Sequence, residues 1–135
     1  MHALLSGFFV VLLVAVVTVA PTAQEGRGGN PEAAKVKNPV ATSPESIAAG
    51  EAVYMKRCRG CHSRDLLGGP PKEAGGHESS NLVDATWDHG STDGEIFHVI
   101  MNGIEPELVM EPWDDRLSPT DSWNVVNFIR SKAQK

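Results

Sequence analysis

The sequence has little of what usually builds or cross-links the core of a small protein. Its only cysteines are Cys58 and Cys61, so any covalent cross-link must use this pair. No segment of useful length alternates apolar and polar residues, and this excludes a β-sheet as the basis of the fold. There is no second C-x-x-C pair and no histidine pair at the spacing of a zinc site, which argues against structural zinc. The chain is therefore predicted to be all-α.

Positively charged residues are also few. The chain has 12 lysines and arginines against 17 aspartates and glutamates, and its formal net charge is −5. An acidic protein repels the phosphates of nucleic acids and of anionic lipid surfaces, so no nucleic-acid partner is expected. The charge favours instead a protein partner with a basic docking surface.

The longest hydrophobic run lies at the N-terminus, in residues 3–20. Small residues at Ala20 and Ala23, followed by a polar stretch from Gln24, predict a secretory signal peptide over residues 1–23. No lysine or arginine precedes the run, and its length of about 18 residues is close to that of a spanning helix, so an uncleaved anchor is the alternative. In both cases the rest of the chain is exported, to the periplasm or elsewhere, and is held at a membrane only if this segment is not removed.

Residues 24–42 are rich in Gly, Pro, Ala and Asn and show neither a helical nor a strand period, which predicts a flexible linker. The ordered domain is expected over residues 43–135. A domain of this size buries a modest fraction of its surface and often needs a cross-link or a bound group to be stable.

Three segments of this domain carry helix signals. The first is expected to begin at Ser43, the second near Thr92 with its end at Gly103, and the third at Ser118. Segments rich in Gly and Pro between them predict long loops. An architecture of about three to five short helices joined by long loops leaves the centre of the domain unfilled. Something other than side chains must occupy that centre.

The string CRGCH at residues 58–62 supplies a suitable group. Cys58 and Cys61 are spaced so that their sulfurs can form thioether bonds with the two vinyl groups of one haem, while His62 binds the iron. Three other uses of the cysteines are weaker: a disulfide, a dithiol redox site, which needs a βαβ context, and a zinc site, which needs further ligands. The sequence thus predicts one covalently attached haem c.

The iron of such a haem usually has Met or His as its second axial ligand. The candidates are Met55, Met101, Met110, His77, His89 and His98. Met55 is too near the attachment site to reach the opposite haem face, and Met101 falls in the last turn of the second helix, where methionine is an ordinary core residue. Met110, in an irregular loop, is the preferred ligand, and His77 is the alternative.

The domain from Ser43 to Lys135 resembles a class I monohaem cytochrome c. The resemblance rests on the helix with Gly50 and Tyr54, on CRGCH, and on NLVDATWDHGSTDGEIFHVIMNGI, MEPW and LSPTDSWNVVNFIR. It implies the small cytochrome c fold, with Met110 as the sixth ligand. It also implies that Gly50 packs on the last helix near Phe128 and that Trp87 and Trp113 line the haem.

One segment departs from the family pattern. The family usually has a Gly-Pro dipeptide after the motif, near which a backbone carbonyl accepts a hydrogen bond from the proximal imidazole. Here the residues before Leu82 read SSN, and the nearest prolines are Pro70 and Pro71. One of these prolines is expected to take that place. The inserted residues Lys72–Ser80 have no role that their sequence indicates.

A haem iron with both axial positions filled has no site for a substrate, so the chain is not expected to be an enzyme. One-electron transfer suits such an iron because its ligands need little rearrangement. The expected function is electron carriage from a dehydrogenase or quinol-oxidising complex to an oxidase or reductase. Two alternatives stay open: a haem subunit docked on a periplasmic dehydrogenase, and a haem-based sensor or ligand-binding protein.

Overall fold

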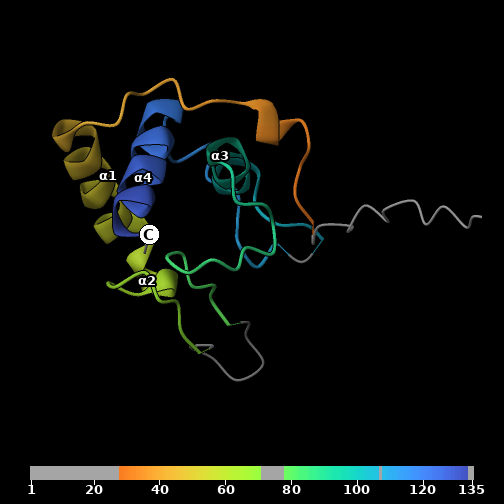
Figure 1. The fold of residues 1–135 in the computed structure, drawn as a ribbon. Helices are drawn as coiled ribbons and strands as arrows, with labels where there is room; N and C mark the ends of the chain where they lie inside the picture. Colours follow the sequence, from red (N-terminus) through yellow and green to blue (C-terminus); the bar gives the residue numbers. More distant parts are fainter. Residues whose placement is uncertain (1–27, 71–77, 107, 134–135) are drawn as a thin grey trace, which may run out of the picture.

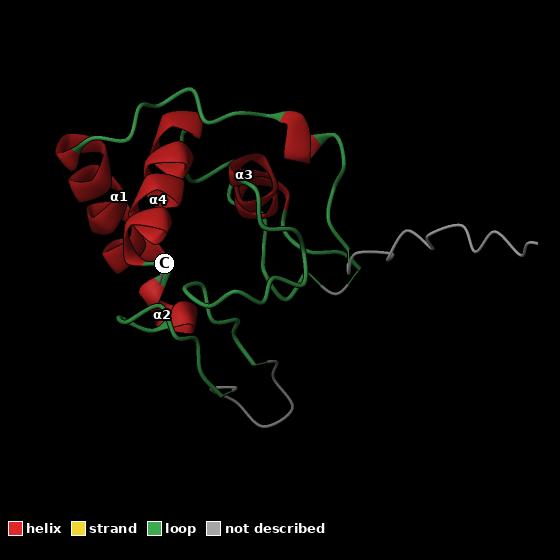
Figure 2. Ribbon diagram, viewed as in Figure 1, coloured by secondary structure: helices red, strands yellow, loops and turns green. Residues whose placement is uncertain are grey.

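The computed structural model describes residues 28–70, 78–106 and 108–133. The predicted signal peptide (1–23) and His77 lie outside the described residues. The elements are η1 (Ala33–Lys35), α1 (Pro44–Arg57), α2 (Arg59–His62), α3 (Asp93–Asn102) and α4 (Pro119–Lys132). Within the described ranges the chain forms helices and long loops, and extended pairing is confined to one isolated bridge between Gly69 and Ser79 (Figure 1, Figure 2). The all-α prediction is confirmed.

The three longer helices begin at the predicted N-caps. The Ser43 hydroxyl accepts a hydrogen bond from the Ser46 N–H at 3.2 Å, and the Ser46 hydroxyl accepts one from the Ser43 N–H at 3.0 Å. Thr92 and Glu95 form the same reciprocal pair at the start of α3, and Ser118 caps α4. These bonds satisfy N–H groups that have no partner inside the helix, and they set where each helix starts.

α1 and α4 pack closely at Gly50. A Cβ on Gly50 would lie 1.9 Å from the carbonyl oxygen of Asn124 and 2.9 Å from the Cβ of Phe128. Glycine is therefore required for the two backbones to come this close. One turn further along α1, the ring of Tyr54 lies 5.3 Å from that of Phe128, centroid to centroid, and both rings are fully buried. The packing implied by the resemblance is confirmed.

α3 contacts α4 on the side away from α1 (Figure 1). The rings of Phe97 and Trp123 stack with centroids 3.9 Å apart and an interplanar angle of 6°. The Ser122 hydroxyl donates to the sulfur of Met101 at 3.2 Å, so this methionine belongs to the contact between the two helices. The buried apolar residues are Tyr54, Leu66, Val83, Ile96, Ile100, Leu117, Trp123, Val125, Val126, Phe128 and Ile129. The core therefore runs along α4.

Residues 28–42, here called the N-terminal strap, run over α3 and α4 to the start of α1 (Figure 1). The Asn38 amide donates to Asn127 Oδ1 at 2.9 Å, and the Thr42 hydroxyl donates to the same oxygen at 3.2 Å. η1 packs on α3 at Gly94, where an added Cβ would lie 2.0 Å from the carbonyl oxygen of Ala33. The described part of this segment is thus held on the domain, whereas a flexible linker was predicted over 24–42.

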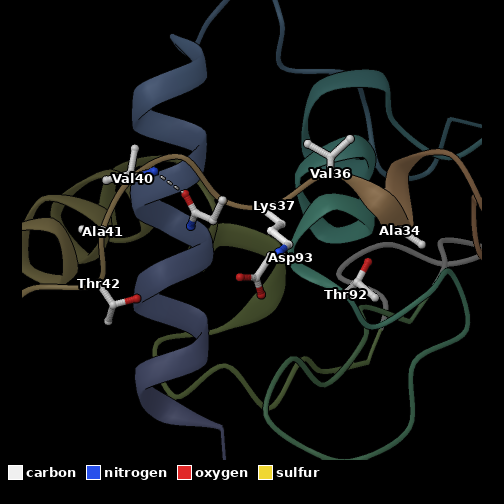
Figure 3. Close-up of a pocket in the computed structure, with 9 residues that line it drawn as sticks. Ala34, Val36, Lys37, Val40, Ala41, Thr42, Thr92 and Asp93 are labelled. Carbon is white, nitrogen blue, oxygen red and sulfur yellow. Dashed lines mark hydrogen bonds between the residues drawn. The ribbon is translucent and has the colours of Figure 1, made fainter.

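A hollow of ≈ 440 Å³ lies between the strap and the start of α3, with Lys37, Thr42 and Asp93 among its lining residues (Figure 3). None of the lining residues belongs to the CRGCH motif, so this hollow is not a haem site. Among the helices that the structure describes, none combines the length and the apolar character needed to cross a membrane.

Candidate functional site

The CRGCH motif continues directly from the end of α1. The Cys58 N–H donates to the Tyr54 carbonyl at 2.8 Å, and the N–H groups of Cys61 and His62 donate to the Cys58 carbonyl at 3.1 and 3.0 Å. Cys58 is half-buried, Cys61 is exposed, and both thiols are free. Three of the four predicted site residues therefore lie on one hydrogen-bonded turn, here called the attachment turn (58–62).

Tyr54 holds the end of this turn from inside the core. Its hydroxyl donates to the carbonyl of Ser63 at 2.8 Å and to that of His62 at 3.2 Å. Burial raises the pKa of Tyr54 above its ordinary value, so the hydroxyl keeps its proton and remains a donor. Ser63 has a positive φ of 61°, which turns the chain away after the histidine. In the sequence Tyr54 serves only to mark the first helix, and nothing there indicates this polar role.

The environment of Cys58 favours the neutral thiol. Burial, and to a smaller extent the neighbouring Cys61, raises the pKa of Cys58 to about 11. The thiolate is the form that binds zinc and exchanges disulfides, and little of it is present at neutral pH. The neutral thiol is therefore the resting form of Cys58 on the attachment turn.

His62 has a defined ring orientation. Its Nδ1 lies 3.2 Å from the backbone carbonyl oxygen of Ser80. A carbonyl can only accept, so Nδ1 carries the proton and the lone pair of Nε2 is available to a metal. Burial lowers the pKa of His62, with the Ser80 bond opposing it, and this favours the neutral imidazole that binds iron. The expectation that Pro70 or Pro71 supplies this carbonyl is wrong, because Ser80 supplies it; Pro71 itself lies outside the described residues.

The reason lies in how the loop after the motif is closed. Gly69 and Ser79 form an antiparallel bridge with N–H to carbonyl distances of 3.2 and 3.0 Å, and the Gly68 N–H donates to the His62 carbonyl at 3.2 Å. These bonds fix the two ends of the inserted segment beside the attachment turn. The position of Ser80 is therefore set by the bridge and not by the prolines that precede the insertion.

Met110 lies half-buried in the connection between α3 and α4. Its carbonyl accepts a hydrogen bond from the Ile104 N–H at 2.9 Å. Gly103 ends α3 with a φ of 73°, and an added Cβ there would lie 2.6 Å from the same Met110 oxygen. The backbone of Met110 is thus tied to the end of α3. No hydrogen bond among the described residues joins Met110 to the attachment turn, so its role as a ligand stays a prediction.

Trp87 and Trp113 are half-buried against the core. The Trp113 N–H donates to the Ile100 carbonyl at 3.0 Å, and the Trp87 indole N–H donates to the Asp84 carbonyl at 3.1 Å. Each tryptophan is therefore fixed by one polar bond while its ring packs with apolar neighbours. Their place beside a haem stays a prediction.

The remaining described histidines and carboxylates do not form a second metal site. His98 Nε2 lies 3.2 Å from the side-chain nitrogen of Asn30, which links α3 to the strap. Within the described ranges, no group of three or more His, Cys, Asp or Glu side chains is arranged to hold a metal ion.

The donor set of the attachment turn fits a covalently bound haem. Two thiols with two residues between them lie on one turn, and the Nδ1 of the adjacent imidazole is fixed by a carbonyl. Partly buried apolar side chains against the core can pack on a macrocycle, and they include Met55, Leu82, Trp87, Phe97 and Trp113. When bound, haem c supplies a one-electron Fe(III)/Fe(II) couple.

Two solved cytochromes cL are similar to this chain in fold. The one from Methylophaga aminisulfidivorans MPT is 23% identical with a TM-score of 0.57, and the match covers 68% of this chain and 56% of that one. The one from Hyphomicrobium denitrificans is 24% identical with a TM-score of 0.53, and the match covers 63% and 46%. The chain thus spans about half the length of these cytochromes, 56% and 46%. No curated protein is significantly similar to it.

A family model extends the likeness from fold to sequence. The model described as cytochrome c oxidase, cbb3-type, subunit III matches residues 45–129, which is more than half of the chain and includes both the attachment turn and Met110. Members of this class of c-type cytochromes transfer electrons through covalently bound haem c and are not themselves enzymes. The chain belongs to the cytochrome c family of cbb3-type cytochrome c oxidase subunit III.

Proposed function

We propose that this protein is a periplasmic one-electron carrier whose haem iron is bound by His62 and Met110. The observation that carries the ligand assignment concerns Met101. Its sulfur accepts a hydrogen bond from the Ser122 hydroxyl at 3.2 Å within the contact between α3 and α4. Met55 lies on α1 beside the attachment turn, which leaves Met110 as the described methionine on irregular, half-buried backbone.

The residues around the two ligands suit electron transfer because they hold both ligands still. Ser80 fixes the imidazole of His62, and the end of α3 fixes the backbone of Met110. Neither ligand then needs to move much when the iron changes its oxidation state. A methionine ligand and apolar packing both favour the ferrous form and raise the potential relative to two histidines.

The ligand pair is tested by visible spectroscopy of the ferric holoprotein. A methionine ligand gives a sulfur-to-iron charge-transfer band, and Met110→Ala should abolish it. Met101→Leu is the matched control, since it replaces a core methionine by a residue of similar volume and should leave the band in place. A band that survives Met110→Ala would show that the assignment is wrong.

The location and the partners complete the proposal. The hydrophobic run in residues 3–20 supports export, and the donor would be a dehydrogenase or quinol-oxidising complex, with an oxidase or reductase as acceptor. Cell fractionation with mass spectrometry of the N-terminus tests the location. A mature chain that starts near Gln24 in the periplasmic fraction is expected, and a full-length chain in the membrane fraction would mean an uncleaved anchor.

A further inference from the structure

Arg116 stands out in the connection between α3 and α4 because it is the single cation in residues 105–117. Its Nη1 and Nη2 donate to Glu111 Oε2 at 3.2 and 3.3 Å, and its Nε donates to Asp115 Oδ1 at 3.1 Å. Nη2 also donates to the Pro112 carbonyl. The guanidinium carbon lies 4.2 Å from the centre of the Trp113 ring. One side chain thus contacts four residues that follow Met110.

The opposite side of Met110 is held differently. The Ile104 N–H donates to the Met110 carbonyl at 2.9 Å, which ties this side to the end of α3. Beyond Met110 the chain is irregular, and Pro112 has no N–H with which to form a backbone hydrogen bond. The next backbone tie to α3 is the Trp113 N–H, which donates to the Ile100 carbonyl at 3.0 Å. Between these two ties, the side chain of Arg116 contacts Glu111 and Pro112 next to Met110.

These contacts are too exposed to contribute much to global stability. The Arg116 side chain is 37% exposed, and its carboxylate partners Glu111 and Asp115 are 66% and 75% exposed. Exposed ion pairs are weakened by water and salt. The planar guanidinium, however, fixes directions: it can bond a carboxylate and a carbonyl at its edge while its face rests on an indole ring. These contacts therefore fix the conformation of the segment after Met110 but add little to the free energy of unfolding.

We infer that Arg116 is a positioning residue for the sixth ligand: it clamps residues 111–115 so that the Met110 sulfur stays on the iron. The inference rests on the proposed His62–Met110 ligation. Without the clamp, Met110 should leave the iron more often, while the fold as a whole stays intact.

Binding of imidazole to the ferric holoprotein measures this directly, because imidazole can enter only when the methionine has left. The rate is followed by loss of the charge-transfer band. Arg116→Gln should raise the binding rate at least tenfold, and Arg116→Lys, which keeps the charge but not the planar fork, should give a smaller rise. Arg130→Gln is the matched control, since Arg130 also pairs with a carboxylate, Asp93 at 2.7 Å, and lies over an indole ring.

The denaturant midpoint of Arg116→Gln, measured by far-UV circular dichroism, should match that of the wild type. Imidazole rates equal to wild type in Arg116→Gln would overturn the inference while leaving the ligand assignment in place. An equal rise in Arg130→Gln would also overturn it, since the effect would then be general. A wild-type protein without the band, or a band that survives Met110→Ala, would overturn the ligand assignment and this inference with it.

Discussion

At the scale of single residues, the site depends on backbone positions as much as on ligand side chains. Gly68 is one of these positions: its φ is 73°, and an added Cβ would lie 2.0 Å from the Ser79 carbonyl oxygen and 2.8 Å from that of Ser80. Gly69 is different, because an added Cβ there meets nothing within 4 Å. Of two adjacent glycines, one is needed to bring the Ser80 carbonyl to His62 and the other is not.

Gly68→Ala is therefore expected to push the Ser79–Ser80 backbone away from the attachment turn. A left-handed conformation costs an L-residue about 1–2 kcal/mol, and the steric overlap adds to this, so the free energy of unfolding of the holoprotein should fall by about 2 kcal/mol or more. The reduction potential should also shift, because the bond to Ser80 sets the basicity of His62. Denaturant unfolding and a redox titration measure the two effects.

Gly69→Ala is the matched control for this substitution. It should leave the potential unchanged and alter the stability by less than about 1 kcal/mol, since the new methyl group has free space. Equal effects of the two substitutions would argue that the loop base does not control the imidazole.

The attachment turn could be predicted from sequence because its chemistry is carried by side chains at a fixed spacing, Cys58, Cys61 and His62. The carbonyl that orients His62 could not be predicted in the same way, since a backbone acceptor has no side-chain signature. One feature of the sequence could have pointed to this carbonyl: Ser80 stands two residues before Leu82, in the region where the family has its Gly-Pro dipeptide. The contacts of Arg116 could not be predicted either. A single arginine among acidic residues looks the same in the sequence whether its side chain holds a loop in place or faces solvent.

At the scale of elements, one buried amide, that of Asn127, makes several of the hydrogen bonds that join the strap to the helices. Asn127 is 2% exposed, and its Oδ1 accepts hydrogen bonds from Asn38 and Thr42 of the strap. Its Nδ2 donates to the Ser46 hydroxyl at 3.1 Å and to the Val40 carbonyl at 3.2 Å. This side chain of α4 therefore contacts both the strap and α1.

We predict that Asn127→Ala loosens the strap and lowers the stability of the domain. The substitution removes the hydrogen bonds that the Asn127 amide makes with Asn38, Val40, Thr42 and Ser46. Each such bond contributes about 0.5–1.5 kcal/mol, so a loss of about 2 kcal/mol or more is expected. Trypsin should also cut faster after Lys35 and Lys37, which lie in the strap. Denaturant unfolding and timed proteolysis with mass spectrometry give the two readouts.

Ser131→Ala is the control, because Ser131 is an exposed residue of α4 whose hydroxyl donates to the Phe128 carbonyl within its own helix. Its proteolysis rate should equal that of the wild type. If Asn127→Ala is cut no faster than this control, the strap is held mainly by η1 on α3 and not by the amide.

The helix starts could be predicted because a cap acts on N–H groups two or three residues further along, so local sequence holds the information. The strap could not be predicted, since its bonds join residues as far apart as Asn38 and Asn127. A segment rich in Gly, Pro and Asn has the same composition whether it is a free linker or is held by side-chain amides. Only the fold brings the partner residues together.

At the scale of the whole molecule, charge is unevenly distributed. Four exposed cations and one exposed carboxylate, Asp65, gather where α1 ends and the attachment turn lies; the cations are Lys56, Arg57, Arg59 and Arg64. Exposed carboxylates gather instead in the connection between α3 and α4, at Glu105, Glu111, Asp114 and Asp115. The net charge of −5 therefore does not describe the surface around exposed Cys61. The prediction of a partner with a basic docking surface rests on the negative net charge. The charge around the attachment turn is positive, opposite in sign to the net charge.

Small redox anions should therefore react with the ferrous holoprotein as if it were positively charged. Salt screens attraction over a Debye length of about 10 Å at 0.1 M, so the stopped-flow rate of oxidation by hexacyanoferrate(III) should fall as ionic strength rises. Repulsion by the net charge would give the opposite salt dependence.

Two substitutions separate the local cluster from the net charge. Lys56→Gln should slow the reaction at low salt. Lys37→Gln removes the same charge from the strap, at the end of the molecule away from α2 (Figure 1), and should have little effect. A rate that rises with salt, or equal effects of the two substitutions, would mean that net charge and not the local cluster governs the approach of a redox partner.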